Sequence, residues 1–326
     1  MRAVTLGLDV GGTRIKWSLV NGDGEPLNSG DVATPKTGGD ELLECIIGIA
    51  KVEGVSAAAV GLAVPGLVNT RSRETLFIPN IPGEWENYPL GRRVGSALDK
   101  PVVVLNDARA FGYAELQVGA AREFSDVLFL TVGTGIGGAL ARDGAMVIDE
   151  LDNVPEMGHV AVEMHGEACG CGATGCLETV ASASAVVAYS TRAVLTGLSP
   201  TLVKLCEGRI ENLPGETVAH AADLGDAWAT GAFERAGTFI GMAAASACLM
   251  ARPEALVIGG GLTGAFRHFA PAVQRLVTDR ASLLGHIEVV QAQLGSRAGS
   301  IGAALYARDR TVQRAPGPRP VSQEEK

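Results

Sequence analysis

Aromatic residues and long apolar runs are scarce in this sequence. Phe, Trp and Tyr make up only 5% of the 326 residues, so few rings are available as stacking platforms. The longest uncharged apolar stretches, at 127–141 and 236–251, are shorter than the roughly 20 residues that a membrane-spanning helix needs. The first residues carry no signal-peptide pattern. These absences predict a cytoplasmic protein that makes no contact with a membrane.

Positive charge is also in short supply. Lys and Arg number 27 against 36 Asp and Glu, which gives a formal net charge of −9 at pH 7. A protein with this balance has no general attraction for nucleic acid or anionic lipid. We therefore expect no nucleic-acid partner, and a polyanionic ligand would need a local cradle.

Short apolar segments alternate with segments of helical spacing, which predicts an α/β protein. Strands are predicted at 4–8, 15–20, 57–64 and 101–105, with helices at 40–52 and 108–118. A second series starts at 127, and its glycine turn at 131–138 resembles the turn at 9–16. Two similar openings in a chain of this length indicate two lobes of related design.

The boundaries of these lobes are predicted from changes in composition. We expect a small N-terminal α/β lobe at 1–118 and a large α/β lobe at 119–299. A helix at about 300–314 is expected to pack back on the small lobe. The polar, Pro-rich tail at 315–326 is expected to be disordered. Within the large lobe, helical spacing predicts one helix over 179–195.

The first glycine turn is a candidate phosphate cradle. Gly11 and Gly12 have no Cβ, so their backbone N–H groups could converge on an anion. Thr13 can add a hydroxyl and Lys16 a cation, and Asp9 could hold Mg²⁺ through water. The alternative is an ordinary β-hairpin turn.

The second glycine turn contains Gly133 and Thr134, and a third glycine run contains Gly260 and Gly261. Neither of the two turns has the pattern of a P-loop or of a dinucleotide-binding fold. Two such turns facing each other would suit a nucleoside triphosphate. Gly260 and Gly261 would then form a third wall close to the base, or else a simple strand-to-helix turn.

A carboxylate follows the predicted strand at 101–105. Asn106 and Asp107 lie at the carboxyl end of that strand, where α/β proteins usually bind ligands. Asp107 could be the N-cap of the following helix. As a catalytic group, it would accept the proton of a hydroxyl that attacks a γ-phosphorus.

Three cysteines lie within eight residues, at Cys169, Cys171 and Cys176, with glycines between them. His159 is the nearest candidate for a fourth ligand. One His and three Cys fill a tetrahedral zinc site without an open position, which is typical of a structural metal. Reduced cytoplasmic thiols and the odd number of cysteines argue against a disulfide.

Two acids, Glu156 and Glu178, flank this cluster. If a metal held the two segments together, both carboxylates and the imidazole of His159 would point to one region. Such a set could bind the hydroxyl groups of a sugar. The alternative is that each glutamate is simply exposed to solvent.

Taken together, these motifs resemble the ROK family of repressors, open reading frames and sugar kinases. The resemblance covers residues 6 to about 308, and its most specific part is Glu156-Met-Gly-His159 followed by Cys169-Gly-Cys171-Gly-Ala-Thr-Gly-Cys176-Leu-Glu178. The turns at 9–16 and 132–135 match the phosphate loops of the family. Val64-Pro65-Gly66, Asn80 and Trp85 match its sugar-side loops.

The resemblance implies a fold and a reaction. The fold would be the two-lobed actin-like ATPase fold, related to ribonuclease H, with nucleotide and sugar in the cleft between the lobes. The reaction would be ATP-dependent phosphorylation of a hexose with Asp107 as general base. Glucose at its 6-hydroxyl is the first choice. N-acetylmannosamine, N-acetylglucosamine, fructose, mannose and allose remain open, as does polyphosphate as the donor.

The resemblance also implies roles for the candidate residues. The sugar would contact Gly66, Asn106, Asp107, Glu156, His159 and Glu178. ATP and Mg²⁺ would contact Asp9, Gly11, Gly12, Thr13, Lys16, Gly133 and Thr134, with Gly260 and Gly261 near the adenosine. His159 is expected to bind zinc with one ring nitrogen and sugar with the other. A homodimer or homotetramer is expected.

Three residues depart from the family pattern. Pro155 precedes Glu156 where Gly is usual, Arg109 replaces an Asn, and Ala183 replaces a Gly. None of these changes removes a catalytic group. Because Pro155 fixes its own φ and restricts Val154, it is expected to affect the choice of sugar more than activity.

The competing hypothesis is a sugar-sensing protein of the same family, either a transcriptional repressor or an inactive sugar binder. Repressor members carry a helix-turn-helix domain ahead of the first phosphate loop. Only eight residues precede Asp9 here, which disfavours the repressor. An inactive binder remains the alternative of another class.

Overall fold

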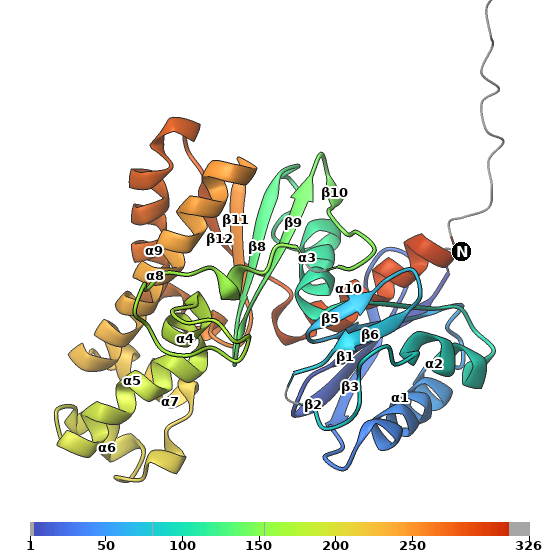
Figure 1. The fold of residues 1–326 in the computed structure, drawn as a ribbon, viewed down its shortest axis with the longest axis horizontal. Coiled ribbons are helices and arrows are strands. Elements are labelled where there is room, and N and C mark those ends of the chain that lie inside the picture. Colours follow the sequence, from blue (N-terminus) through green and yellow to red (C-terminus); the bar gives the residue numbers. More distant parts are fainter. Residues whose placement is uncertain (1–2, 80, 153, 313–326) are drawn as a thin grey trace, which may run out of the picture.

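Two five-stranded sheets form the framework of the molecule (Figure 1). The computed structural model describes residues 3–79, 81–152 and 154–312. In spatial order the first sheet contains β3 (Pro26–Ala33), β2 (Arg14–Val20), β1 (Thr5–Val10), β4 (Val60–Val64) and β7 (Val102–Asn106). β1 to β3 are antiparallel, whereas β1, β4 and β7 run parallel. The aliphatic sequences of β1 and β4 suit strands that are buried on both faces.

The second sheet repeats this design. In spatial order it contains β10 (Ala145–Met146), β9 (Ile136–Arg142), β8 (Val127–Val132), β11 (Ala255–Gly259) and β12 (Glu288–Gln291). Its first three strands are again antiparallel, and β8, β11 and β12 run parallel. The similarity between the two glycine turns therefore reflects the same hairpin at the same place in each sheet.

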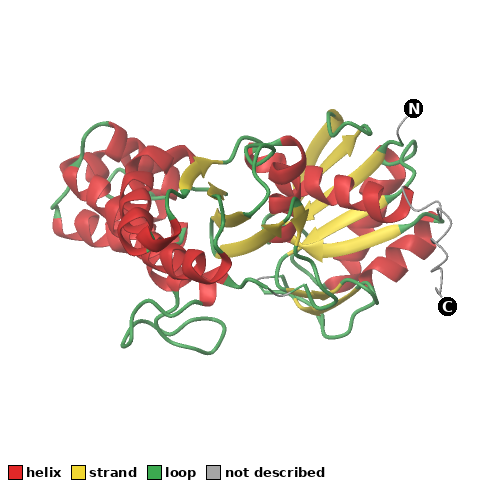
Figure 2. Cartoon of the chain, turned by 90° about the horizontal axis from the view of Figure 1, so that it is seen from above, coloured by secondary structure: helices red, strands yellow, loops and turns green. Residues whose placement is uncertain are grey.

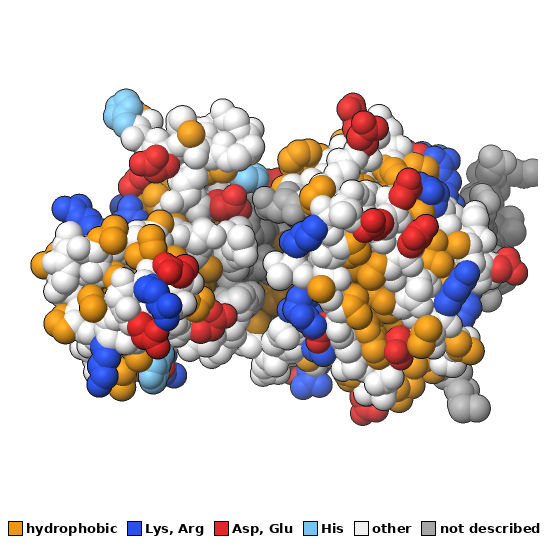
Figure 3. Space-filling view, turned by 90° about the horizontal axis from the view of Figure 1, so that it is seen from below, with side chains coloured by type: hydrophobic (Ala, Val, Ile, Leu, Met, Phe, Trp, Pro, Cys, Tyr) orange, Lys and Arg blue, Asp and Glu red, His pale blue; other side chains and the backbone are white. Residues whose placement is uncertain are grey.

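Helices cover the outer parts of both lobes (Figures 1 and 2). In the first lobe they are α1 (Gly39–Glu53) and α2 (Leu90–Leu98). α2 packs on α1 and contacts β6 (Glu74–Phe77), which forms a small hairpin with β5 (Leu67–Asn69). The second lobe has α4 (Leu177–Ala181), α5 (Ala183–Thr196), α6 (Pro200–Leu205), α7 (Gly215–Asp223), α8 (Ala227–Ala251) and α9 (Phe266–Arg280). Seen from below, the molecule narrows between the two lobes (Figure 3).

Two helices lie between the sheets. α3 (Asp107–Val118) and α10 (Ala298–Ala307) pack on each other; α10 also lies on β1 and β4, and α3 on β9. Every residue of α10 is buried. The helices approach very closely at Gly302, where a Cβ would lie 1.8 Å from the carbonyl oxygen of Ala110. A side chain larger than hydrogen at 302 would separate them.

Short single-turn helices complete the structure, including η1 (Met157–His159) just before the cysteine cluster. The others are η2 (Ile210–Asn212), η3 (Thr263–Ala265), η4 (Ser282–Leu284), η5 (Gly295–Arg297) and the π-helical η6 (Arg308–Val312). No helix among the described residues has both the length and the apolar character needed to cross a membrane.

The structure differs from the sequence-based expectation in several places. The helix predicted over 179–195 is broken at Ser182, which has extended backbone and caps α5 by accepting from Ala185 N. α2, β12 and the β5–β6 hairpin were not predicted. The domain boundaries at 118 and 299 stay predictions, and the tail at 315–326 lies outside the described residues.

Candidate functional site

The carboxyl end of β7 presents Asn106 and Asp107. Asn106 is the N-cap of α3, since its side-chain oxygen accepts from the backbone nitrogens of Ala108 (2.9 Å) and Arg109 (3.3 Å). The capping role that the sequence left open for Asp107 therefore belongs to its neighbour. The Oδ1 of Asp107 accepts from Ala108 N at 2.8 Å. Within the described part of the chain, no hydrogen bond uses its other oxygen, Oδ2.

The pKa of Asp107 is unusual for a carboxyl group. Burial and the nearby charge of Asp9 raise this pKa to about 7, although Ala108 N–H and Arg109 favour the ionised form. Burial likewise raises the pKa of Asp9 to about 6, against the effect of Lys16. A carboxyl group poised near neutrality is suited to accept a proton, and a pair of such acids favours a divalent cation.

The first glycine turn joins β1 and β2. Gly11 N–H donates to Arg14 O at 3.0 Å, and the Gly11 carbonyl accepts from the hydroxyl of Thr34 at 2.6 Å. The Gly12 carbonyl accepts from Lys36 Nζ at 2.8 Å. No acceptor for the backbone N–H groups of Gly12 and Thr13 lies among the described residues. Both groups are therefore free to bind an anion.

Thr13 lies in the turn itself and is exposed. Lys16 on β2 stands directly opposite Asp9 on β1. This register brings a cation and an acid to the same end of the first sheet.

The second glycine turn meets the third glycine run. Leu262 N–H donates to Val132 O at 2.9 Å, and a Cβ on Gly261 would lie 3.6 Å from Gly133 Cα. Gly260 has φ +94°, and a Cβ there would lie 2.7 Å from the Val132 backbone. Only glycine fits at this position. The structure thus brings together two runs that are separated by more than 100 residues in the sequence.

Three of the candidate sugar-side residues, Gly66, Asn106 and Glu178, form hydrogen bonds at the ends of β7 and the second glycine turn. Asn106 Nδ2 donates to Gly66 O at 2.9 Å, so these two predicted residues are in direct contact. Glu178 Oε2 accepts from Ile136 N at 2.9 Å, at the base of the second glycine turn. Asn80, which the resemblance placed near the sugar, lies outside the described residues.

Sequence reasoning gave no role to a buried arginine beside these groups. Arg109 donates to Asn106 Oδ1 at 3.0 Å and to Glu156 Oε1 at 2.8 Å. Its Nε faces Asp152 Oδ1 at 3.6 Å, and Asp152 Oδ2 in turn accepts from Asn106 N at 2.6 Å. The available signal was that Arg109 is the one charged residue in the otherwise uncharged sequence 108–114.

The cysteine cluster has the geometry of a metal site. One ligand atom each from His159, Cys169, Cys171 and Cys176 lies within 4.8 Å of all the others. His159 Nδ1 is 3.6 Å from Cys169 Sγ, and Cys171 Sγ is 3.7 Å from Cys176 Sγ. Zn–S bonds of about 2.3 Å imply tetrahedral edges of roughly 3.8 Å. The four side chains therefore fit a tetrahedral zinc ion.

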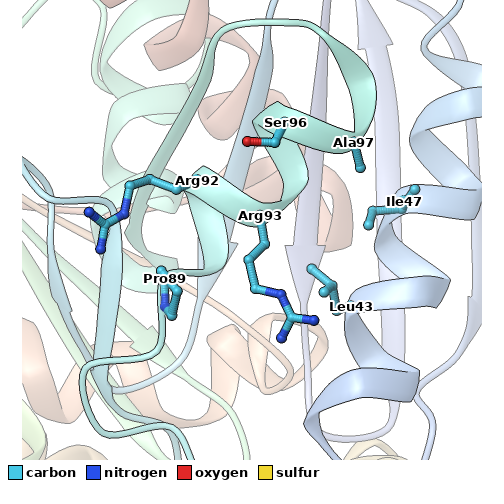
Figure 4. A pocket seen from close by; sticks show the side chains of 7 residues that line it. All are labelled: Leu43, Ile47, Pro89, Arg92, Arg93, Ser96 and Ala97. Carbon is cyan, nitrogen blue, oxygen red and sulfur yellow. The ribbon is translucent and has the colours of Figure 1, made fainter.

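A hollow of about 620 Å³ lies elsewhere, between α1 and α2 (Figure 4). Leu43 and Ile47 of α1 line one side, and Arg92 and Arg93 of α2 line the other. Arg93 also forms an ion pair with Asp40. None of the residues that line this hollow belongs to the candidate site.

Proteins of known family resemble this chain over nearly its whole length. The family model described as "ROK family" matches residues 5–310. A glucokinase of Streptomyces coelicolor is 31% identical, over 94% of this chain and 98% of its own. An N-acetylmannosamine kinase of Escherichia coli O157:H7 is 27% identical, over 93% of this chain and 98% of its own.

A solved structure shares the fold closely. The ROK family glucokinase of Streptomyces griseus, crystallised with glucose and AMPPNP, superposes with a TM-score of 0.85 at 33% identity. The match covers 94% of this chain and 99% of the other. The predicted two-lobed actin-like ATPase fold is confirmed. With the family model spanning nearly all of its length, this chain belongs to the ROK family.

Proposed function

We propose that this protein is an ATP-dependent hexose kinase that phosphorylates glucose at its 6-hydroxyl. The observation that carries the proposal is Asp107, a carboxyl group with a pKa of about 7 beside two glycine turns and two further acids. The similarity to two Streptomyces glucokinases over almost the entire chain supports glucose as the substrate.

Asp107 would act as the general base. The sugar hydroxyl gives its proton to the Asp107 carboxylate while its oxygen attacks the γ-phosphorus of ATP. The new O–P bond forms as the bond to the β-phosphate oxygen breaks, and ADP leaves. Such a base contributes about 10²–10⁴-fold to the rate, and the remainder comes from positioning and charge neutralisation.

The glycine turns would bind the nucleotide. The N–H groups of Gly12 and Thr13 and the turn at Gly133–Thr134 would hold the phosphates, with Gly260 and Gly261 near the adenosine. Asp9 would hold Mg²⁺, with Lys16 nearby. Mg²⁺ would neutralise the charge that develops on the transferred phosphoryl group.

The sugar would lie against Gly66, Asn106, Glu156, His159 and Glu178. His159 has its Nδ1 turned toward Cys169, which leaves Nε2 for a sugar hydroxyl. Zinc bound by His159 and the three cysteines would have a structural role, since four protein ligands leave no open coordination position. The metal would hold the imidazole in one orientation.

A cytoplasmic location, predicted from the sequence composition, and a homodimer or homotetramer, implied by the resemblance, stay predictions. Two alternatives for the activity also remain. The Escherichia coli relative supports an N-acylhexosamine as the substrate. A sugar-binding regulator without activity is the alternative of another class, and the ionisable Asp107 argues against it.

The test is ADP release by the purified protein with Mg²⁺ and ATP. The panel contains glucose, mannose, fructose, allose, N-acetylglucosamine and N-acetylmannosamine, with a reaction lacking sugar as the baseline. The proposal expects the highest kcat/KM with glucose. If kcat/KM is higher with N-acetylmannosamine, that sugar and not glucose is the preferred substrate. If no sugar raises ADP release above the rate without sugar, the proposal of a hexose kinase is wrong.

A further inference from the structure

Arg109 is a deeply buried charged side chain at the candidate site. It is 1% exposed, and its guanidinium reaches three groups on two segments. One is Asn106 at the end of β7, and the other two are Asp152 and Glu156 in the segment between β10 and η1. Removing a guanidinium from water is costly, and a buried ion pair is weak evidence for stability by itself. Its position must therefore be explained in some other way.

The contact with Glu156 engages only half of that carboxylate. Oε1 accepts from Arg109 Nη2 at 2.8 Å, whereas no hydrogen bond among the described residues uses Oε2. The Glu156 side chain is 36% exposed. One oxygen is thus fixed inside the protein, and the other remains open to a ligand. A carboxylate held in this way offers a single acceptor in a defined direction.

The contact with Asn106 links the same guanidinium to the residue before Asp107. Arg109 Nη1 donates to Asn106 Oδ1, and Asp152 accepts from Asn106 N. Asn106 Nδ2 in turn donates to Gly66 O. Arg109 therefore fixes the loop that carries Glu156 relative to the strand end that carries the general base.

We propose that Arg109 is a positioning residue that sets sugar specificity by aiming Glu156 Oε2 at one hydroxyl of the substrate. The inference rests on the proposed function and deepens it. A rigid acceptor discriminates between epimers, because an epimer with its hydroxyl in another direction leaves this acceptor unpaired in the complex. Without the guanidinium, Glu156 can rotate, and this discrimination is lost.

The test compares Arg109→Met, Arg109→Lys and a matched control. Arg109→Met keeps most of the side-chain volume and removes the guanidinium group. We expect its KM for the preferred hexose to rise on the order of 10- to 100-fold, with the KM for ATP changed less than about twofold. The ratio of kcat/KM between that hexose and its epimers should fall about tenfold. Arg109→Lys retains the charge and should lie between wild type and Arg109→Met.

The control is Arg308→Met. Arg308 is also mostly buried and pairs with Asp309 at 2.7 Å, outside the candidate site. Its loss should reduce stability without changing sugar KM or epimer ratios. Glu156→Gln combined with Arg109→Met gives a double-mutant cycle, and the two effects should be strongly non-additive.

The outcomes separate this inference from the proposed function. An active wild type whose Arg109 variants match Arg308→Met in sugar KM and epimer ratios would overturn the inference and leave the kinase intact. A wild type without activity on any hexose would overturn both. If Arg109→Met does not fold, Arg109→Lys alone decides, because unchanged epimer ratios in that variant would reject the inference.

Discussion

Glu178 accepts a hydrogen bond from the backbone N–H of Ile136, with Oε2 2.9 Å from the nitrogen. Glu178 lies two residues after Cys176 in the first turn of α4, and Ile136, within the glycine turn at 131–138, begins β9. One carboxylate thus joins the cysteine cluster to the proposed phosphate-binding turn. A change in the cluster should therefore affect nucleotide binding as well as sugar binding.

Removal of the metal is the first prediction. Cys176→Ser should reduce the bound zinc from one ion per chain to none, because Cys176 is a buried ligand of the proposed site. With the segment at 169–178 released, kcat/KM for both sugar and ATP should fall on the order of 10- to 100-fold. Metal analysis and steady-state kinetics measure both effects. Cys45→Ser, outside the cluster, should keep its zinc and its activity; zinc in Cys176→Ser at the wild-type level would contradict the assignment.

The second prediction concerns the general base. Asp107→Asn retains an oxygen that can accept from Ala108 N but cannot take a proton from the sugar. We expect kcat to fall by about 10²–10⁴-fold. Sugar affinity, measured by calorimetry, should change less than about threefold. Activity of this variant within tenfold of wild type would remove Asp107 as the base.

The pH dependence of activity is the third prediction. Because only ionised Asp107 accepts a proton and its pKa is about 7, kcat/KM for the sugar should rise with pH up to about 7 and then level off. Below pH 7 the rise should approach tenfold per pH unit. Initial rates between pH 5.5 and 8.5 at constant ionic strength measure this limb. A profile that is flat over this range would contradict the raised pKa.

The fourth prediction is that the raised pKa of Asp107 makes the stability of the protein depend on pH. The folded pKa of Asp107, about 7, exceeds its ordinary value of 3.8, so the folded state binds more protons between these values. Stability therefore falls as pH rises through this window. Asp107→Asn removes this cost, on the order of 1–3 kcal/mol at pH 8, and should raise Tm there but not at pH 4.

Asp126→Asn is a control with the opposite expected sign, because the pKa of Asp126 is lowered rather than raised. The backbone N–H of Asp143 lowers the pKa of Asp126 below its ordinary value. The ionised form of Asp126 is thus favoured by folding, and its replacement should lower Tm at pH 8. Equal Tm shifts in the two variants at pH 8 would reject the sign argued for Asp107.

The sequence was most informative where the candidate chemistry lies within one short segment. The cysteines at 169–176 and His159 are close along the chain, and their types alone indicated zinc. The fold class followed from the alternation of apolar strands and helices. Both glycine turns were found because a turn of glycines between two strands leaves a local pattern.

Interactions between distant segments left no comparable pattern. Arg109 and Glu156 are 47 residues apart, and nothing in the spacing of the two indicates that they meet. The break at Ser182 was missed because apolar residues continue at helical spacing on both sides of it. α2 was missed because its sequence contains two glycines among nine residues, and glycine weakens the helical signal.

The fifth prediction concerns Glu115, which joins the segment after α3 to the segment after β12. Its carboxylate is fully buried and accepts from Ala120 N (2.8 Å), Leu294 N (2.8 Å) and Gln293 N (3.1 Å). Ala120 lies between α3 and β8, whereas Gln293 and Leu294 lie between β12 and η5. In Glu115→Gln an NH₂ group replaces one acceptor and faces backbone N–H donors. We expect the free energy of unfolding to fall by about 2–4 kcal/mol, because hydrogen bonds to a buried charge are replaced by a donor–donor contact.

Glu123→Gln makes the same chemical change at an exposed position nearby and should alter the unfolding free energy by less than about 0.5 kcal/mol. Urea unfolding measures both variants, and hydrogen exchange localises the effect. In Glu115→Gln the amides of Ala120, Gln293 and Leu294 should exchange faster, since these are the groups that lose their acceptor. If the two variants unfold at the same urea concentration, the buried carboxylate does not stabilise this junction, and the relative position of the lobes depends on the packing of α3 against α10 instead.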